Sequence, residues 1–206
     1  MKRNGFTIIE LMVGLLIAML IMLMVLMFFK QISQVSISSS QDAEYDAQLQ
    51  TGTLVAQKFI QNAGYGSGAS DDIEIGTYSG NDAILWRFIP DINAVPISYE
   101  CQGIGEKITA SGSLYLHRLV LLTKSGCGAS TALTSGTWTE YQPIMSIKTS
   151  RSEPIYDYSL ASGNCAPFGI DQQSSGLKQL TITAHRQHMT GTGSTIQTVI
   201  CLNNIK

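Results

Sequence analysis

The feature that most constrains this chain is an uncharged apolar run from Leu11 to Phe29, close to the N-terminus. About 20 apolar residues in a helix span the hydrocarbon core of a bilayer. Inside lipid every backbone polar group must be hydrogen-bonded within the segment, so the run is expected to be a helix. Lys2 and Arg3 precede it, which predicts a cytoplasmic N-terminus and an exported remainder. The residues after the run lack a small-residue cleavage pattern, so we expect the helix to be retained.

A single carboxylate, Glu10, stands at the start of this helix. On insertion scales a charged residue at the membrane centre costs about 2.5–3.5 kcal/mol, and less near the interface, so such residues usually have a partner. Two interpretations are open. Glu10 lies in the headgroup layer, or it pairs with a positive group. Cleavage between Gly5 and Phe6 would create an amine four residues before Glu10. In a bundle of parallel helices, that amine could neutralise the carboxylate of the neighbouring chain.

The residues from Lys2 to Met12 read Lys-Arg-Asn-Gly-Phe-Thr-Ile-Ile-Glu-Leu-Met. This segment resembles the class III signal of type IV prepilins and type II secretion pseudopilins. In that family a membrane-embedded prepilin peptidase cuts after the glycine and N-methylates the new terminal phenylalanine. The resemblance therefore implies cleavage after Gly5, N-methylation of Phe6 and an assembly role for the carboxylate of Glu10.

A second stretch, Val55–Gly66, ends in Asn-Ala-Gly-Tyr-Gly. It resembles the helix end of PilW-type minor pilins, and the corresponding part of J-type minor pseudopilins of type II secretion. This chain has Gln61 and Asn62 where that family usually carries an arginine. Independently of the resemblance, Gly64 predicts a helix end, because glycine readily adopts the left-handed conformation that closes many helices.

The expected fold is α+β, the type IV pilin fold, with a long N-terminal helix packed on an antiparallel β-sheet. Apolar residues recur at helical spacing through residues 30–62, and no proline occurs before Pro90, so one helix from Phe6 to Asn62 is predicted. Beyond Gly64, short β-type runs alternate with turn residues. These runs are Ile73–Gly76, Ala83–Ile89, Ile97–Cys101, Ser113–Thr123, Ile144–Thr149, Ile155–Ser159, Leu177–His185 and Thr195–Leu202.

The last two runs flank the turn residues Thr190–Ser194 and predict a hairpin. The whole chain then divides into four parts. Residues 1–5 form a cleaved leader, and residues 6–29 a transmembrane or filament-core helix. Residues 30–63 form the periplasmic half of the helix, and residues 64–206 a β-rich globular domain.

Four cysteines follow the membrane helix, and the predicted export places them in an oxidising compartment where disulfides form. Four cysteines allow three pairings, which the sequence does not distinguish. We favour Cys101–Cys127 and Cys165–Cys201, because sequential pairing suits neighbouring strands. A bridge near the C-terminus also resembles the pilin habit of fastening the last segment. Free buried thiols are the alternative. A zinc site is not expected, since no C-x-x-C spacing occurs.

The chain carries no recognisable catalytic motif, so no enzyme activity and no cofactor are expected. Of the three histidines, His117 lies in a strand-like run and is expected to be structural. His185 and His188 would point to opposite faces of a strand, so no metal site is expected there. Asp71, Asp72 and Glu74 offer a weak cation site, with a solvated loop as the default interpretation.

Two tryptophans are candidates for contacts. Trp86 lies in an apolar run and is expected in the core, whereas Trp138 lies in a Thr- and Gly-rich loop. We expect Trp138 to be partly exposed, and a contact with another subunit or a ligand is one possible role. Only 14% of the 206 residues are charged, and no basic patch is visible, so nucleic acid is not an expected partner.

The resemblance implies assembly rather than chemistry: a minor pilin of the priming or tip complex of a type IV pilus. The alternatives are a minor pseudopilin of type II secretion and a pilus-tip adhesin or DNA-uptake subunit. Expected partners are the prepilin peptidase, other minor and major pilins through the N-terminal helix, the inner-membrane assembly platform, and inner-membrane lipid before assembly. The expected location is the inner membrane with a periplasmic C-terminal domain, and later the pilus at the cell surface.

Overall fold

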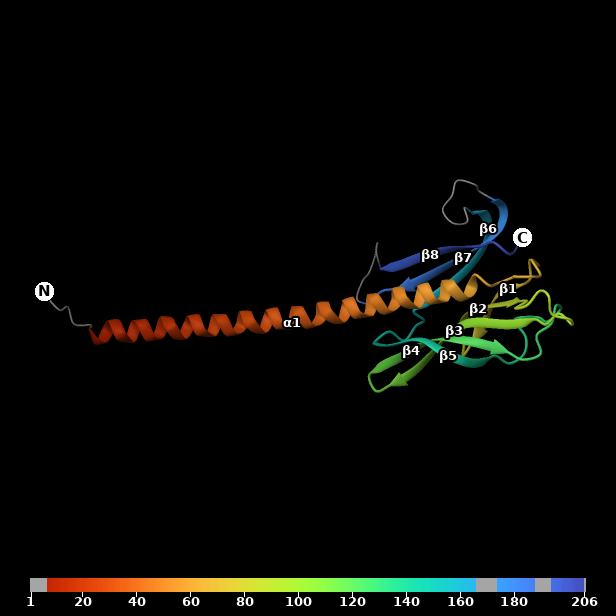
Figure 1. Ribbon diagram of the computed structural model, residues 1–206. Helices are drawn as coiled ribbons and strands as arrows, with labels where there is room; N and C mark the ends of the chain where they lie inside the picture. The colour runs from red at the N-terminus through yellow and green to blue at the C-terminus, as the bar shows by residue number, and fades with distance from the viewer. Residues whose placement is uncertain (1–6, 166–173, 188–193, 206) are drawn as a thin grey trace. The chain divides into compact units, whose positions relative to one another are not determined.

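The computed structural model describes residues 7–165, 174–187 and 194–205. One helix is followed by eight strands (Figure 1). They are α1 (Ile8–Ile60), β1 (Ile73–Tyr78), β2 (Asn81–Phe88), β3 (Glu100–Ser111), β4 (Leu114–Lys124), β5 (Thr139–Thr149), β6 (Tyr156–Cys165), β7 (Ser174–His185) and β8 (Thr195–Leu202). The long N-terminal helix and the antiparallel sheets give the α+β, type IV pilin-like architecture expected from the sequence.

The chain forms two compact units, Met1–Glu44 and Tyr45–Lys206. In the first unit, the described part of α1 exposes its apolar side chains on all sides. By length and composition, α1 is the one helix within the described ranges that could cross a membrane. The boundary between the units falls inside the segment 30–63 that the sequence assigns to the periplasmic half of the helix, because burial begins at Tyr45.

The second unit contains two antiparallel sheets instead of the single one expected. Strands β1 to β5 form a meander in sequence order, and β6, β7 and β8 form a separate sheet. The predicted hairpin is present as β7 and β8, which pair from Lys178↔Leu202 to His185↔Thr195. Figure 1 shows the two sheets on opposite sides of the C-terminal part of α1.

That part of α1 buries one stripe of side chains: Tyr45, Leu49, Gly52, Thr53, Ala56 and Ile60. The stripe joins one hydrophobic core with residues of both sheets, including Ile104 of β3 and Leu180 of β7. Trp86 is fully buried in this core, as expected. The core therefore needs the helix as its middle layer, because each sheet offers it one apolar face.

Strand β3 is much longer than the predicted run Ile97–Cys101. The strand contains Gly103 and Gly105, although glycine weakens strand interiors. The fold uses them for close packing. A Cβ on Gly103 would lie 2.7 Å from Leu85, and one on Gly105 would lie 2.9 Å from Tyr78. The two positions therefore accommodate neighbouring side chains on the outer face of the sheet.

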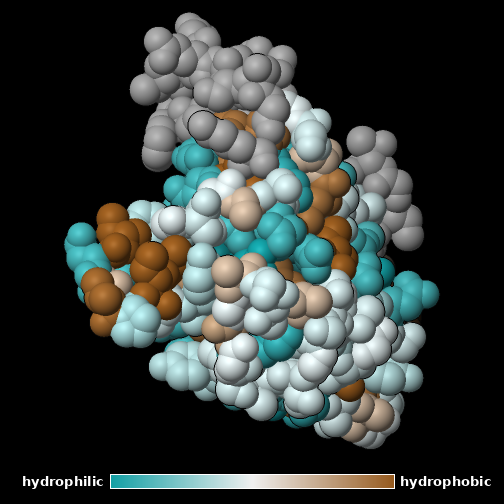
Figure 2. Space-filling view, turned by 90° about the vertical axis from the view of Figure 1, so that its right-hand side faces the viewer, coloured by the Kyte–Doolittle hydropathy of each residue, from teal (hydrophilic) through white to brown (hydrophobic). Residues whose placement is uncertain are grey.

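Helix α1 ends at Ile60, and the next residues form turns. Gly64 adopts a positive φ of 71°, as predicted for a residue that closes a helix, and its N–H donates to the carbonyl of Arg87 at 2.9 Å. The loop between β2 and β3 exposes Ile92, Val95 and Ile97. Viewed from the right-hand side of Figure 1, the surface is mostly hydrophilic or intermediate, with separate hydrophobic patches (Figure 2).

Candidate functional site

The first turn of α1 holds Glu10 in a hydrogen-bonded cap. The backbone N–H and the hydroxyl of Thr7 both donate to Oε2 of Glu10 at 3.3 Å. The N–H of Glu10 donates back to the Thr7 hydroxyl at 3.4 Å. This reciprocal pattern is a capping box, which the sequence Thr-x-x-Glu before an apolar run signals and which the sequence analysis did not use. The cap satisfies helix N–H groups and places the carboxylate at the positive end of the helix dipole.

The surroundings of Glu10 are apolar and uncovered. From Ile8 to Phe29 it is the one charged residue, and its large apolar neighbours are exposed, Ile8 by 80% and Leu11 by 62%. Such a surface needs lipid or other helices around it, because water is an unfavourable solvent for it. Gly5 and Phe6, the predicted cleavage and methylation residues, lie outside the described residues.

A second site of interest lies on the outer face of the five-stranded sheet, where residues 125–138 fold over it. Cys101 of β3 and Cys127 form a disulfide, the pairing favoured from the sequence. With Ala83, Leu85, Val120, Leu122 and Leu133 they build a small second hydrophobic cluster. Cys201 is also disulfide-bonded. The side chain of Cys165, its predicted partner, lies outside the described residues.

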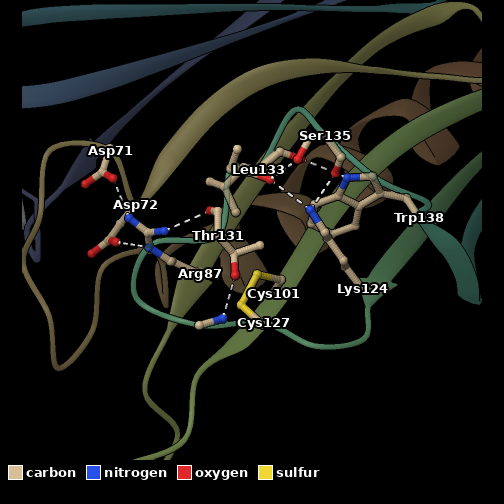
Figure 3. Close-up of a disulfide and its surroundings, with 12 residues drawn as sticks. Asp71, Asp72, Arg87, Cys101, Lys124, Cys127, Thr131, Leu133, Ser135 and Trp138 are labelled. Atoms are coloured by element: carbon tan, nitrogen blue, oxygen red, sulfur yellow. Dashed lines mark hydrogen bonds and ion pairs between the residues drawn. A yellow bond between two sulfur atoms is a disulfide. The ribbon is translucent and has the colours of Figure 1, made fainter.

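Arg87 ties this region to the loop that follows α1 (Figure 3). Its side chain is buried, and it donates at 2.5 Å to both Asp71 and Asp72 and at 3.0 Å to the carbonyl of Thr131. Asp72 also accepts hydrogen bonds from Ser67 and from the N–H of Ala69. The buried charges of Arg87 and Asp72 are therefore paired and hydrogen-bonded, as buried charges must be.

The interpretation of Asp71 and Asp72 as a solvated loop or weak cation site was incorrect for Asp72. Its carboxylate is buried and neutralised by Arg87, a residue fifteen positions away that sequence reasoning did not connect to it. The hydrogen bond from Arg87 also lowers the pKa of the exposed Asp71. Among the described residues, no group of three or more His, Cys, Asp or Glu side chains could hold a metal ion.

Trp138 is partly buried, as expected, and has internal partners. Its Nε1–H donates to the carbonyl of Leu133 at 3.0 Å, and its ring contributes to the second hydrophobic cluster. The ammonium of Lys124 lies 5.7 Å from the ring centroid and donates to the carbonyls of Ala132 and Ser135 (Figure 3). The loop is thus held to the sheet by cation–π and hydrogen-bonding contacts.

The most deeply buried pair of ionisable side chains is Glu106 of β3 with His117 of β4. Oε1 of Glu106 lies 2.5 Å from Nδ1 of His117, and both side chains are almost inaccessible. Oε2 accepts the N–H groups of Ile155 and Tyr156 at 2.8 and 3.1 Å. The pair therefore connects the five-stranded sheet to the first residue of β6. The structural role expected for His117 is present, but its partner Glu106 was not foreseen.

The geometry of this pair fixes one proton. Nε2 of His117 lies 2.8 Å from the carbonyl of Arg151 and, because a carbonyl only accepts, that nitrogen must carry a hydrogen. Nδ1 of His117 and Oε1 of Glu106 lie within hydrogen-bonding distance of each other. His185 instead lies at the surface, 2.7 Å from Asp157. Its possible co-ligand His188 lies outside the described residues.

Comparison with known families adds one finding. Residues 1–26 match the family described as the prokaryotic N-terminal methylation motif. No curated protein and no solved structure matches the chain. The motif, which is the type IV prepilin-like signal, and the α+β architecture indicate a type IV pilin-like or pseudopilin protein. The motif implies processing by prepilin peptidase and pilin assembly, and with the apolar helix it is consistent with inner-membrane anchoring.

Proposed function

We propose that this protein is a minor pilin that takes part in type IV pilus assembly, in the priming or tip complex. The observation that carries the proposal is the exposed apolar half of α1 with Glu10 as its one charged residue, inside the segment that matches the methylation motif. Lipid covers this surface before assembly, and the helices of other subunits cover it afterwards. Glu10 then sets the axial position of each helix against its neighbour.

An assembly role is also what the folded unit supports, and we propose no enzymatic activity. Its buried charged groups are used to hold the structure together. Arg87 pairs with Asp72, and Glu106 pairs with His117 and two backbone N–H groups. The proposed partners are the prepilin peptidase, the other minor and major pilins, and the inner-membrane assembly platform. The proposed final location is the pilus at the cell surface.

The test begins with filaments sheared from wild-type cells and from cells that lack this gene. The proposal expects filaments to be lost in the deletion strain, and expects wild-type filaments to contain this chain at low abundance with N-methyl-Phe6 as its terminus, read by mass spectrometry. A Gly5→Leu variant should keep its leader and remain in the membrane. If its size and terminus match the wild type, the processing step is wrong.

Glu10 is tested with a pair of variants. Glu10→Ala removes the carboxylate, whereas Glu10→Asp keeps the charge on a shorter side chain. Both should be cleaved and should reach the membrane. We expect Glu10→Ala to fail to restore filaments to the deletion strain and Glu10→Asp to restore them in part. Full restoration by Glu10→Ala would contradict the assembly role of the carboxylate.

The same helix and motif also fit a minor pseudopilin of type II secretion. In that case the deletion strain keeps its surface filaments and loses protein secretion. A tip adhesin or DNA-uptake subunit is tested through the loop of residues 125–138. Trp138→Ala would abolish adhesion or uptake while filaments persist. Loss of filaments together with adhesion leaves assembly as the simpler account.

A further inference from the structure

The loop between β2 and β3, residues 89–99, exposes three aliphatic side chains close together in the sequence. Ile92 is 55% exposed, Val95 96% and Ile97 57%. We call these three residues the apolar loop patch. Single exposed apolar residues are common on protein surfaces, whereas neighbouring ones that form a patch often mark a contact with another molecule.

The loop that carries the patch has a defined conformation. Ile89 is buried, and its N–H donates to the carbonyl of Tyr65 at 2.8 Å. The carboxylate of Asp91 accepts the N–H of Asn93 at 2.9 Å, and the carbonyl of Asp91 accepts the N–H of Ala94 at 3.3 Å. The patch is therefore presented by an ordered turn, and a surface that is already ordered loses little conformational entropy when it binds.

The charged residues beside the patch are acidic. Asp91 in the loop and Glu100 at the start of β3 are both exposed. Residues 88–101 contain no lysine or arginine, and Arg87 before them is buried with partners of its own. Complementary charge favours association, so the expected partner combines an apolar surface with positive charge. Anionic lipid headgroups and nucleic acid phosphates have the opposite character.

The other end of β3 carries basic side chains. The strand is 12 residues long, so the loop before Glu100 and the β3–β4 hairpin after Ser111 lie roughly 35 Å apart. Arg118 of β4 lies two positions before Val120, a residue of the outer hydrophobic cluster, and therefore faces outward as well. Lys107 of β3 lies directly opposite Arg118 in the register of the two strands and shares this outer face.

A third cation and an apolar side chain complete this surface. Lys148 of β5 lies opposite Leu116, two residues before Arg118, and so shares the outer face. Leu114, a further two residues away, is 40% exposed. Among the described residues, one carboxylate, Glu140, pairs with the other two cations, at 2.8 and 3.6 Å. The hairpin end of the sheet thus has an excess of positive charge beside an exposed leucine.

We propose that the apolar loop patch of one copy docks on the hairpin end of a second copy of this chain. The chain itself supplies both complementary surfaces, one apolar and acidic, the other apolar and basic. Because the two surfaces differ and lie at opposite ends of β3, the contact is head-to-tail, and such a contact can continue along a filament. The inference rests on the proposed function, and it adds a contact on the folded unit to those of the N-terminal helix. A subunit of low abundance would form short runs of adjacent copies.

The first experiment uses the full chain in cells that assemble filaments. Benzoylphenylalanine, a photoreactive amino acid, replaces Val95. A matched control carries it at Val199, which is 56% exposed on β8 in the other sheet. After irradiation, we expect position 95 to yield an adduct of two copies that mass spectrometry maps to residues 107–118, and position 199 to yield no adduct of two copies. An adduct of position 95 with a different protein or with another part of the second copy, or no adduct, would overturn the proposal.

A charge exchange tests whether the two surfaces recognise each other. Glu100→Lys and Lys148→Glu each place like charges in the contact, so each should lower the yield of the position 95 adduct several-fold. The two substitutions together restore opposite charges, and the yield should recover. A double variant whose yield stays as low as that of the single variants would also overturn the proposal. Failure of the proposed function is recognised separately, by intact filaments in the deletion strain or by an unmethylated N-terminus while the position 95 adduct persists.

Discussion

The two ends of helix α1 differ both in composition and in surroundings, the first being almost wholly apolar and the second amphipathic. Before Glu44 its apolar residues are exposed on every side, and from Tyr45 onward one stripe is buried between two sheets. Gly14 and Gly52 show the difference. A Cβ on Gly14 would meet nothing within 4 Å, whereas one on Gly52 would lie 2.8 Å from the hydroxyl of Tyr156. One helix therefore serves two tasks, and the second depends on contacts distant in sequence.

The largest loss of stability is expected from the buried Glu106–His117 pair in the sheet-containing unit. Glu106→Ala leaves His117 and two N–H groups without their acceptor, and the loss of one partner of a buried pair is expected to cost about 3–5 kcal/mol. The measurement is denaturant unfolding of the full chain in detergent, followed by the fluorescence of the buried Trp86.

The matched control is Glu140→Ala on the same sheet. Glu140 pairs with Lys107 at a partly exposed site, where such pairs contribute about 1 kcal/mol or less. Two hydrogen bonds lower the pKa of Glu140. The one from Lys107 has the larger effect, and the one from Tyr78 the smaller. Equal losses of stability for the two variants would show that the buried Glu106–His117 pair stabilises the fold no more than the partly exposed Glu140–Lys107 pair does.

The next largest effect is expected from the disulfide. Replacing Cys101 and Cys127 together with alanine opens a loop with a sequence separation of 26. The unfolded chain then gains conformational freedom, and a loss of about 3 kcal/mol is expected. Unfolding under the same conditions measures it. An unchanged denaturation midpoint would mean that the Arg87 contacts alone hold this region.

The two glycines give a direct test of the two halves of the helix. Gly52→Ala forces Tyr156 or Met145 to move, and overpacking of this kind costs about 1–3 kcal/mol. Part of that loss is offset by the better helix propensity of alanine. Gly14→Ala makes no such contact and should leave the unfolding of the sheet-containing unit unchanged. Equal effects at both positions would contradict the assigned packing.

The smallest effect concerns alkaline pH. Burial raises the pKa of Tyr45 from 10.0 to about 12, and it raises that of Tyr158 as well. A raised folded pKa means that the stabilisation is complete below pH 10 and is lost as the pH rises toward 12. Denaturant midpoints at pH 8 and pH 11 should differ less in Tyr45→Phe than in the wild type. Tyr141→Phe, at an exposed position, serves as the control.

The sequence predicted the N-terminal helix better than it predicted the sheet-containing unit. The apolar run, the helix, its end near Gly64 and the β7–β8 hairpin follow from local patterns, and the structure contains them. The signal of the capping box, Thr7 and Glu10, was also local and was overlooked. The methylation motif was recognisable because the residues that define it are contiguous.

What the sequence did not predict depends on contacts between distant segments. The partition into two sheets follows from tertiary packing around the helix, which no strand pattern encodes. Glu106 looked like an ordinary charge in a glycine-containing stretch, and its burial is explained by His117 and by the start of β6. Arg87 lies between the apolar residues Trp86 and Phe88 of β2, and its partners are in loops that come before and after it in the sequence.

The cap of Glu10 by Thr7 has a thermodynamic consequence for a filament. A carboxylate that already holds hydrogen bonds in the single chain gains only the difference between those bonds and the ones that a neighbouring amine would supply. If Glu10 changes partners on assembly, the step is an exchange of interactions, and exchanges are readily reversed. Thr7→Val, which removes the hydroxyl, would then slow filament disassembly relative to the wild type. With such a cap, the carboxylate of Glu10 has hydrogen-bond donors in the single chain before any partner arrives.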